Sequence, residues 1–253
     1  INGTLSESEQ KAIGFPWSLG MVERAQCSAG ATIQAAREAL MRGVSGNLAG
    51  GTHHAYSDRG GGFCVFNDVA VACRLMQAEH HRQHSDPFKV AIIDLDVHQG
   101  NGSARIFQND DSVFTLSLHG AKNFPFEKEV SDLDIELPDG TEDESYLSHL
   151  SHALNELQSR FKAQFIFYLA GADPYVGDRL GRLSLSMDGL RSRDQAVFSW
   201  ARERNLPLAF VMAGGYGQDM NETAQIQVNT FFEAYDSWQL WQARNQAEGP
   251  LKR

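Results

Sequence analysis

The stretch that decides the fold is VAIIDLDVHQGNG, residues Val90 to Gly102. Four apolar residues lead directly into Asp94, Asp96 and His98. A continuous apolar and β-branched run is typical of a strand that is buried on both faces of a parallel sheet. Burying two carboxylates and an imidazole at the end of such a strand costs several kcal/mol or more unless they are paired or bound to a metal. The stretch therefore predicts a buried strand that ends in a polar site.

The rest of the chain alternates strands with helices. Residues 1–18 predict irregular structure, residues 43–62 predict a long glycine-rich functional loop, and Thr141 with Glu144 predicts a capping box. The pattern predicts one α/β domain over residues 1–253, with a mostly parallel sheet covered by helices on both faces in three layers. The predicted strands are 88–95, 113–118, 133–137, 164–170 and 208–212, and the predicted helices are 19–42, 68–83, 103–108, 142–162, 187–205 and 222–243.

The composition limits the classes of function. The net charge of −10 argues against general nucleic-acid binding, and an acidic surface mostly serves solubility. The three cysteines lack CxxC spacing, so neither a disulfide framework nor a cysteine zinc site is expected. No apolar run approaches the about 20 residues of a membrane span, and no signal-peptide pattern opens the chain. We therefore expect a cytoplasmic protein, and because the chain starts at Ile1 rather than Met, we expect an N-terminal part to be missing.

Three further polar features accompany the opening stretch. Asp173 directly follows the predicted strand 164–170, and Tyr216 lies between glycines after the strand 208–212. His53 and His54 lie in the glycine-rich loop. Each alone also has a plain structural explanation, as an Asp-Pro turn, an aromatic turn residue or an exposed histidine pair. Ligands bind at the carboxyl ends of parallel strands, so the joint occurrence of these features favours one site.

The residue types at this edge suit a catalytic zinc ion. If the strand continues through His98, then Asp94, Asp96 and His98 share one face, because residues two apart in a strand point the same way. Asp96, His98 and Asp173 provide carboxylate and imidazole ligands, a set that suits Zn²⁺. Three protein ligands leave a fourth position open for water, as in catalytic rather than structural sites.

The histidine pair and the tyrosine add proton-transfer chemistry. An imidazole near its ordinary pKa is the usual general acid or base, which predicts this role for His53 and His54. The hydroxyl group of Tyr216 can donate a hydrogen bond to a developing oxyanion. These residue types therefore predict a catalytic metal site with proton-transfer groups and an oxyanion donor beside it.

Taken together, the motifs resemble the histone deacetylase superfamily. They occur in the family order over residues 50–217, as GGTHHAYSDRGGGFCVFND, IIDLDVHQGNG, LSLHG, AGADPYVGDRLG and AGGYG. The wording HQGNG, SDRGGGFC and GDRLGRLSLS is most similar to class IV deacetylases and their bacterial relatives. The resemblance implies the arginase/deacetylase fold and a zinc-dependent deacylase that acts on acyl-lysine in proteins or peptides.

The resemblance also implies a role for each matching residue. The implied catalytic residues are His53, His54 and Tyr216, with His54 as the proton shuttle. The implied zinc ligands are Asp96, His98 and Asp173. A structural K⁺ would be bound by Asp94, Ser117 and the carbonyl groups of His98 and Leu118, next to Asp96. The acyl-lysine tunnel would be lined by Gly62, Phe63, Phe124 and Gly214. Asp178 is expected to brace a loop rather than to bind metal.

Two departures from the commoner family pattern affect the expected chemistry. Asn101 stands where class I members have an aspartate beside the second histidine, and an amide supports an imidazolium less well than a carboxylate does. We therefore expect His54 to be less basic. Gly100 stands where the related arginases have a further aspartate ligand, so we expect one metal ion rather than two.

Alternatives to a protein-lysine deacylase stay open from the sequence. A small acylated amine such as an acetylpolyamine is a second possible substrate, although no long insertion separates the motifs. A catalytically silent module that binds acylated ligands is a third reading, from a different class of function. Acyl-chain length, acetyl or longer, and oligomeric state are not readable from the motifs.

Overall fold

The sheet of this protein is entirely parallel. A computed structural model describes residues 2–248, and within them six strands pair in the order β1-β6-β5-β2-β3-β4. The strands are β1 Val44–Asn47, β2 Val90–Asp94, β3 Val113–Gly120, β4 Leu133–Leu137, β5 Phe165–Leu169 and β6 Leu208–Val211. The helices are α1 Glu7–Ile13, α2 Leu19–Arg42, α3 Asp68–His81, α4 Asn101–Phe107, α5 Asp143–Arg160, α6 Met187–Glu203 and α7 Met220–Glu248. The predicted α/β class is confirmed, while the extent of a single domain over 1–253 stays a prediction.

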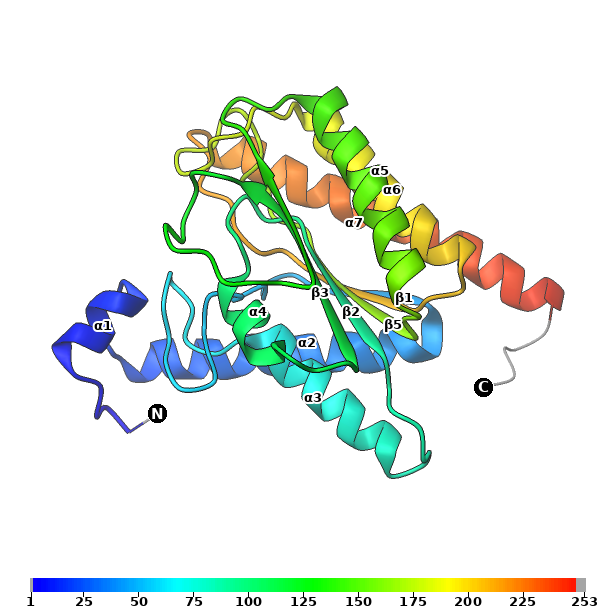
Figure 1. The fold of residues 1–253 in the computed structure, drawn as a ribbon, viewed down its shortest axis with the longest axis horizontal. Helices are drawn as coiled ribbons and strands as arrows, with labels where there is room; N and C mark the ends of the chain where they lie inside the picture. The colour runs from blue at the N-terminus through cyan, green and yellow to red at the C-terminus, as the bar shows by residue number, and fades with distance from the viewer. Residues whose placement is uncertain (1, 249–253) are drawn as a thin grey trace.

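Helices cover both faces of the sheet because its central strands are apolar on both sides. Successive residues of β2 point to opposite faces, so Ile93 packs into one hydrophobic cluster and Ile92 into the other. Helices α5, α6 and α7 pack on the Ile93 face, and α2, α3 and α4 pack on the Ile92 face. Figure 1 shows these two sets of helices on either side of the strands. The three-layer prediction is therefore confirmed.

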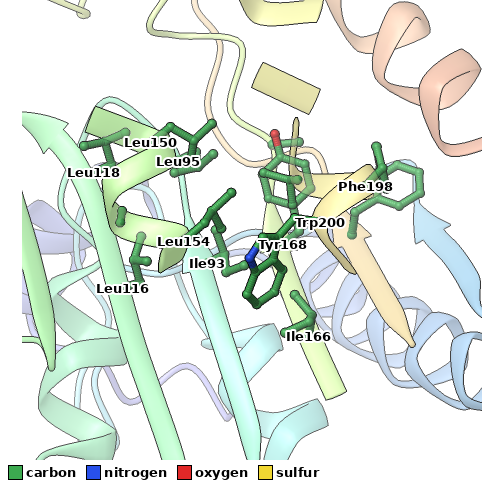
Figure 2. Close-up of a cluster of buried hydrophobic side chains, with 14 of the residues drawn as sticks. Ile93, Leu95, Leu116, Leu118, Leu150, Leu154, Ile166, Tyr168, Phe198 and Trp200 are labelled. Carbon is green, nitrogen blue, oxygen red and sulfur yellow. The ribbon is translucent and has the colours of Figure 1, made fainter. Parts of the chain in front are cut away.

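The larger cluster supports the strands that lead to the polar edge. Its members Ile93, Leu116 and Ile166 come from β2, β3 and β5, and they pack against Leu154 of α5 and Trp200 of α6 (Figure 2). All three strand residues are at most 1% exposed. Burial of such a side chain stabilises the fold by about 1.5–3 kcal/mol, so the strand ends rest on a rigid base.

Two short elements were not predicted. Residues 7–13 form the helix α1, although the sequence before Leu19 predicted irregular structure. Ser6 and Glu9 cap the N-terminus of this helix with a capping box, in which the backbone N–H of Ser6 donates to Oε2 of Glu9 at 2.7 Å. Residues 44–47, predicted as part of a loop, form the edge strand β1, which pairs with β6.

Two predicted local features were placed wrongly. The strand β2 ends at Asp94, so Asp96 and His98 lie on bends beyond it and do not share a strand face with Asp94. Thr141 is not the N-cap of α5, because its hydroxyl group donates to the carbonyl oxygen of Pro138 and Glu142 occupies the cap position. Among residues 2–248, no helix is long and apolar enough to cross a membrane.

Candidate active site

Three ligand-type side chains meet beyond the carboxyl ends of β2 and β5. Asp96 and His98 follow β2, and Asp173 follows β5. Because the chain bends after Asp94, backbone N–H groups rather than strand periodicity orient the carboxylates. The N–H of His98 donates to Oδ1 of Asp96 at 2.9 Å, and the N–H of Val97 donates to Oδ1 of Asp173 at 2.9 Å. The second bond ties the two strand ends together.

The donor atoms of these residues fit a zinc ion. Nδ1 of His98 lies 2.9 Å from Oδ1 of Asp96 and 3.2 Å from Oδ2 of Asp173. One ligand atom from each of the three residues lies within 4.8 Å of the others. Two carboxylate oxygens and one imidazole nitrogen are a donor set that Zn²⁺ accepts readily. The predicted zinc ligands are therefore brought together, and zinc itself stays a prediction.

Burial concentrates charge in this cluster. Asp173 is fully buried, and burial with the nearby Asp96 carboxylate raises the pKa of Asp173 to about 7. Burial lowers the pKa of His98, but hydrogen bonds to Asp173 and Asp96 outweigh it and raise that pKa to about 11. Two buried carboxylates against one imidazole form an environment that a cation stabilises.

The predicted histidine pair lies beside the same carboxylates. Nδ1 of His53 lies 2.6 Å from Oδ2 of Asp94, and Nδ1 of His54 lies 2.7 Å from Oδ1 of Asn101. Their Nε2 atoms face each other at 3.2 Å. Nε2 of His53 is also 3.9 Å from Oδ1 of Asp96. Each ring is therefore fixed at Nδ1 and turns Nε2 toward its partner.

The two histidines differ in basicity because their Nδ1 partners differ. Burial lowers the pKa of His53, but the Asp94 and Asp96 carboxylates outweigh this effect and raise it to about 9. Burial, followed by the charge of His53, lowers the pKa of His54 well below its ordinary value, and the Asn101 amide only partly opposes this. This lowering comes from burial and from His53, so the expectation that Asn101 supports His54 less well than an aspartate would stays a prediction.

Tyr216 is held in place through its backbone. Its N–H donates to Oδ2 of Asp178 at 2.6 Å, while the N–H groups of Leu180 and Gly181 donate to Oδ1 at 2.7 and 2.9 Å. The N–H of Arg179 donates in turn to the carbonyl oxygen of Tyr216 at 3.1 Å. Asp178 thus braces two loops, as the sequence predicted, and one of its bonds is to the backbone of the tyrosine itself.

A pocket of about 510 Å³ connects these groups. Its wall includes the four predicted tunnel residues, Gly62, Phe63, Phe124 and Gly214, together with Tyr216. The ring of Phe124 meets His54 edge-on at 4.8 Å, and the ring of Phe63 lies 6.0 Å from that of Tyr216. A Cβ added at Gly214 would overlap Oδ2 of Asp173, so a side chain there would enter the carboxylate cluster. An apolar wall with a polar floor is the usual form of a small-molecule site.

Two of the residues predicted to bind a monovalent cation lie on β3, next to Asp94. Asp94 and Ser117 are direct neighbours in the β2–β3 pairing, and Leu118 follows on β3. Oγ of Ser117 forms a hydrogen bond with Nδ1 of the buried His119 at 2.9 Å. A K⁺ ion at this position stays a prediction.

Several residues that shape the site were not predicted. The end of α1 reaches the pocket, where the carbonyl groups of Ala12 and Ile13 accept the N–H groups of Gly62 and Phe63 at 3.1 and 2.8 Å. The Ser6–Glu9 spacing was the available signal for this helix. Tyr56 accepts a hydrogen bond from Nδ2 of Asn101 at 3.0 Å.

Buried Asp68 is a further supporting residue that was not predicted. Its carboxylate accepts the N–H groups of Gly51 and Thr52 at 3.1 and 2.8 Å, and the Thr32 hydroxyl at 2.6 Å. These bonds fix the loop just before His53. No short sequence pattern signals either Tyr56 or Asp68, because their partners are distant in the chain.

Comparison with known proteins gives a consistent result. Residues 3–231 match the family model described as the histone deacetylase domain. An uncharacterized protein of Picosynechococcus sp. is 46% identical over 220 residues, which is 87% of this chain and 72% of that protein. Histone deacetylase 2 of Arabidopsis thaliana is 38% identical over 190 residues, which is 74% of this chain and 48% of that protein.

A solved structure is similar over most of the chain. The crystal structure of a histone deacetylase homologue from Aquifex aeolicus superposes with a TM-score of 0.73 at 25% identity, covering 91% of this chain and 68% of that one. The chain therefore spans about half the length of the Arabidopsis relative and about two thirds of the Aquifex structure.

Proposed function

This chain belongs to the histone deacetylase family, and on that premise we propose that it is a zinc-dependent hydrolase of acyl-lysine amides. The substrate would be an acetyl or longer fatty acyl group on the lysine side chain of a protein or peptide. The observation that carries the proposal is the convergence of Asp96, His98 and Asp173 with the histidine pair in one pocket.

The metal would be bound by the two carboxylates and Nδ1 of His98. A zinc ion there would polarise the acyl carbonyl group and make water a stronger nucleophile at neutral pH. Gly214 supports this arrangement in two ways. Its N–H donates to Oδ2 of Asp96 at 2.7 Å, and its lack of a side chain leaves room beside the Asp173 carboxylate.

The histidine pair would move the protons of the reaction. Asp94 holds the Nδ1 proton of His53, and the Oδ1 atom of Asn101 holds that of His54. The two Nε2 atoms, 3.2 Å apart, can therefore share one added proton. The raised pKa of His53 keeps one proton on the pair, while the lowered pKa of His54 leaves that imidazole able to accept another. We assign to His54, whose ring borders the tunnel residue Phe124, both uptake of the proton of the attacking water and its delivery to the leaving amine.

Tyr216 and the aromatic wall would orient the substrate. The tyrosyl hydroxyl group would donate to the acyl oxygen as negative charge develops there, an interaction commonly worth about 3–4 kcal/mol of barrier height. Phe63 and Phe124, which are 49% and 39% exposed, would pack against the methylene groups of the lysine side chain. We also propose that K⁺ binds beside Asp94 and Ser117 and stabilises the strand end behind His53.

The proposal is tested with a substrate panel. Zinc-loaded protein is assayed on lysine peptides with acyl groups from acetyl to myristoyl, and on acetylpolyamines, with Asp173→Ala as the control. We expect turnover of at least one acyl-lysine peptide by the wild-type chain, and in the control we expect loss of turnover and of the zinc ion bound by Asp96, His98 and Asp173. Turnover of acetylpolyamines alone would replace the substrate class. If zinc is bound but no substrate is turned over, the result would favour the third hypothesis, a catalytically silent module that binds acylated ligands.

A further inference from the structure

A second group of metal-ligand side chains lies near the amino end of β2, at the end of the sheet opposite to the candidate active site. His80 and His84 follow one another at the end of α3, and Asp86 lies in the connection to β2. The candidate active site lies beyond the carboxyl end of β2, whereas this group precedes its first residue, Val90. In Figure 1, α3 ends at the lower tip of the molecule, where the chain turns back toward β2. The proposed catalytic site does not use these residues.

The local backbone brings the two histidines together. Although α3 ends at His81, the N–H of His84 donates to the carbonyl oxygen of His80 at 2.9 Å, which continues the helical spacing by one more turn. Residues four apart on a helix lie on the same side. The two imidazole rings accordingly stack, with centroids 4.3 Å apart. This i, i+4 arrangement is the spacing with which helices offer two imidazoles to one metal ion.

The third residue and one unpaired nitrogen point to a ligand. Oδ1 of Asp86 lies 3.6 Å from Nε2 of His80, which is too long for a hydrogen bond. That nitrogen is buried and has no hydrogen-bond partner among the described residues. One ligand atom from each of the three side chains lies within 4.8 Å of the others. A buried polar atom without a partner is costly, and a metal bond would satisfy it.

The surroundings hold one ring rigid and leave the other groups free to adjust. His80 stacks on the buried Phe88 with centroids 4.9 Å apart, and its side chain is only 17% exposed. The Asp86 side chain is 65% exposed, and His84 is also exposed, so the carboxylate can rotate and the His84 ring can turn out of its stack on His80 to direct a nitrogen at a common ion. The group lines a hollow of about 730 Å³, which Asn205 and Pro207 border from the other side.

We propose that His80, His84 and Asp86 form a second site for a divalent transition-metal ion, with Zn²⁺ as the ion of choice. Two imidazole nitrogens and one carboxylate oxygen are the borderline donors that this ion accepts. Because the three side chains line the hollow, water could complete the coordination of the ion. Bound metal would fasten the segment between α3 and β2 to the end of the helix, so this site stabilises the fold and takes no part in the hydrolysis.

Metal stoichiometry of the full chain tests the proposal without reference to activity. Chelator-treated protein is titrated with Zn²⁺ and analysed for bound metal, and thermal unfolding is measured with and without the ion. We expect two equivalents in the wild type, and one in either His84→Ala or Asp173→Ala. The double variant should bind none. In the Asp173→Ala background, zinc should still raise the unfolding temperature, and His84→Ala should abolish that increase.

His81→Ala is the matched control, because His81 is the exposed neighbour of His80 on the same helix but lies outside the group. It should keep both equivalents. A wild type that binds one equivalent, a His84→Ala variant that binds two, or equal loss in the His81 control would each overturn the proposal. Failure of the proposed deacylase would appear as absent turnover with both equivalents bound, so the two failures are distinguishable.

Discussion

At the scale of single residues, removal of the Tyr216 hydroxyl group is expected to affect turnover without affecting zinc binding. The side chain lines the pocket and is not part of the Asp96, His98 and Asp173 group. We therefore expect Tyr216→Phe to lower kcat by about 10²-fold or more, since it removes one oxyanion donor. Bound zinc should be unchanged by metal analysis. Near-normal turnover in this variant would remove Tyr216 from the mechanism.

The lack of a side chain at Gly214 leads to a second prediction at this scale, which concerns zinc affinity. A Cβ at this position would overlap Oδ2 of Asp173 and lie 2.7 Å from Oδ2 of Asp96. We expect Gly214→Ala to weaken zinc binding by at least about tenfold, as loss of a supporting contact around metal ligands commonly does. A competition titration with a chromogenic chelator measures the affinity. Gly30→Ala is the control, because a Cβ there meets no atom within 4 Å; equal affinities in both variants would contradict the steric argument.

At the scale of elements, Asp178 connects two loops that the chain sequence separates. Its carboxylate accepts hydrogen bonds from the N–H groups of Leu180, Gly181 and Tyr216. These bonds fix the position of the Tyr216 backbone relative to the pocket. We expect Asp178→Ala to lower kcat by about tenfold or more, because an ångström-scale misplacement of a catalytic group already costs that much. It should have little further effect in the Tyr216→Phe background. Additive losses in this double-mutant cycle would mean that Asp178 acts through general stability instead.

The same scale shows which elements could be predicted from the sequence. Strands β2 and β5 were predictable because they are continuous apolar runs, and the proposed zinc ligands were predictable because they come soon after those runs. The way in which Asp96 and His98 are oriented was not predictable. The prediction that they share a strand face with Asp94 was wrong, because β2 ends at Asp94. Backbone donors such as Val97 N–H orient the carboxylates instead, and such long-range bonds leave no periodic signal.

Short elements at the edge of the fold escaped prediction for a related reason. The strand β1 has four residues, including Gly46, and is stabilised by pairing with β6 rather than by its own propensity. Helix α1 has seven residues, and only the Ser6–Glu9 cap marked its start. Its position against Gly62 and Phe63, which makes it part of the pocket, depends on tertiary hydrogen bonds.

At the scale of the whole molecule, a buried ion pair links helix α6 to the strand ends at the candidate active site. Arg193 of α6 is fully buried and contacts the Asp194 carboxylate with Nη2 at 2.8 Å. Its Nη1 donates to the carbonyl oxygens of Gly171 at 2.6 Å and Leu95 at 3.4 Å. Leu95 lies one residue before Asp96 and Gly171 lies two residues before Asp173, the proposed zinc ligands that follow β2 and β5. The ion pair therefore connects helix α6 to the segments that follow both β2 and β5.

The surroundings of Asp194 make this pair costly to break. Oδ2 of Asp194 accepts the Thr230 hydroxyl of α7 at 2.6 Å, and Oδ1 accepts the hydroxyl of Tyr168 on β5. The carboxylate is therefore held in the interior and cannot turn to solvent. Removing only the arginine leaves an uncompensated buried charge, whereas removing both charged groups does not.

We accordingly expect Arg193→Met to lower the free energy of unfolding by about 3–5 kcal/mol, measured by urea denaturation. The double variant Arg193→Met/Asp194→Leu should recover much of that loss, because it removes the stranded charge. The exposed pair of Arg42 and Glu38 is the control, and Arg42→Met should cost less than about 1 kcal/mol. If the double variant were as unstable as Arg193→Met, the loss would come from the hydrogen bonds of the two side chains, including those to Gly171 and Leu95, rather than from the uncompensated charge. In that case zinc affinity should fall in both variants, since the same bonds hold the strand ends that carry the ligands.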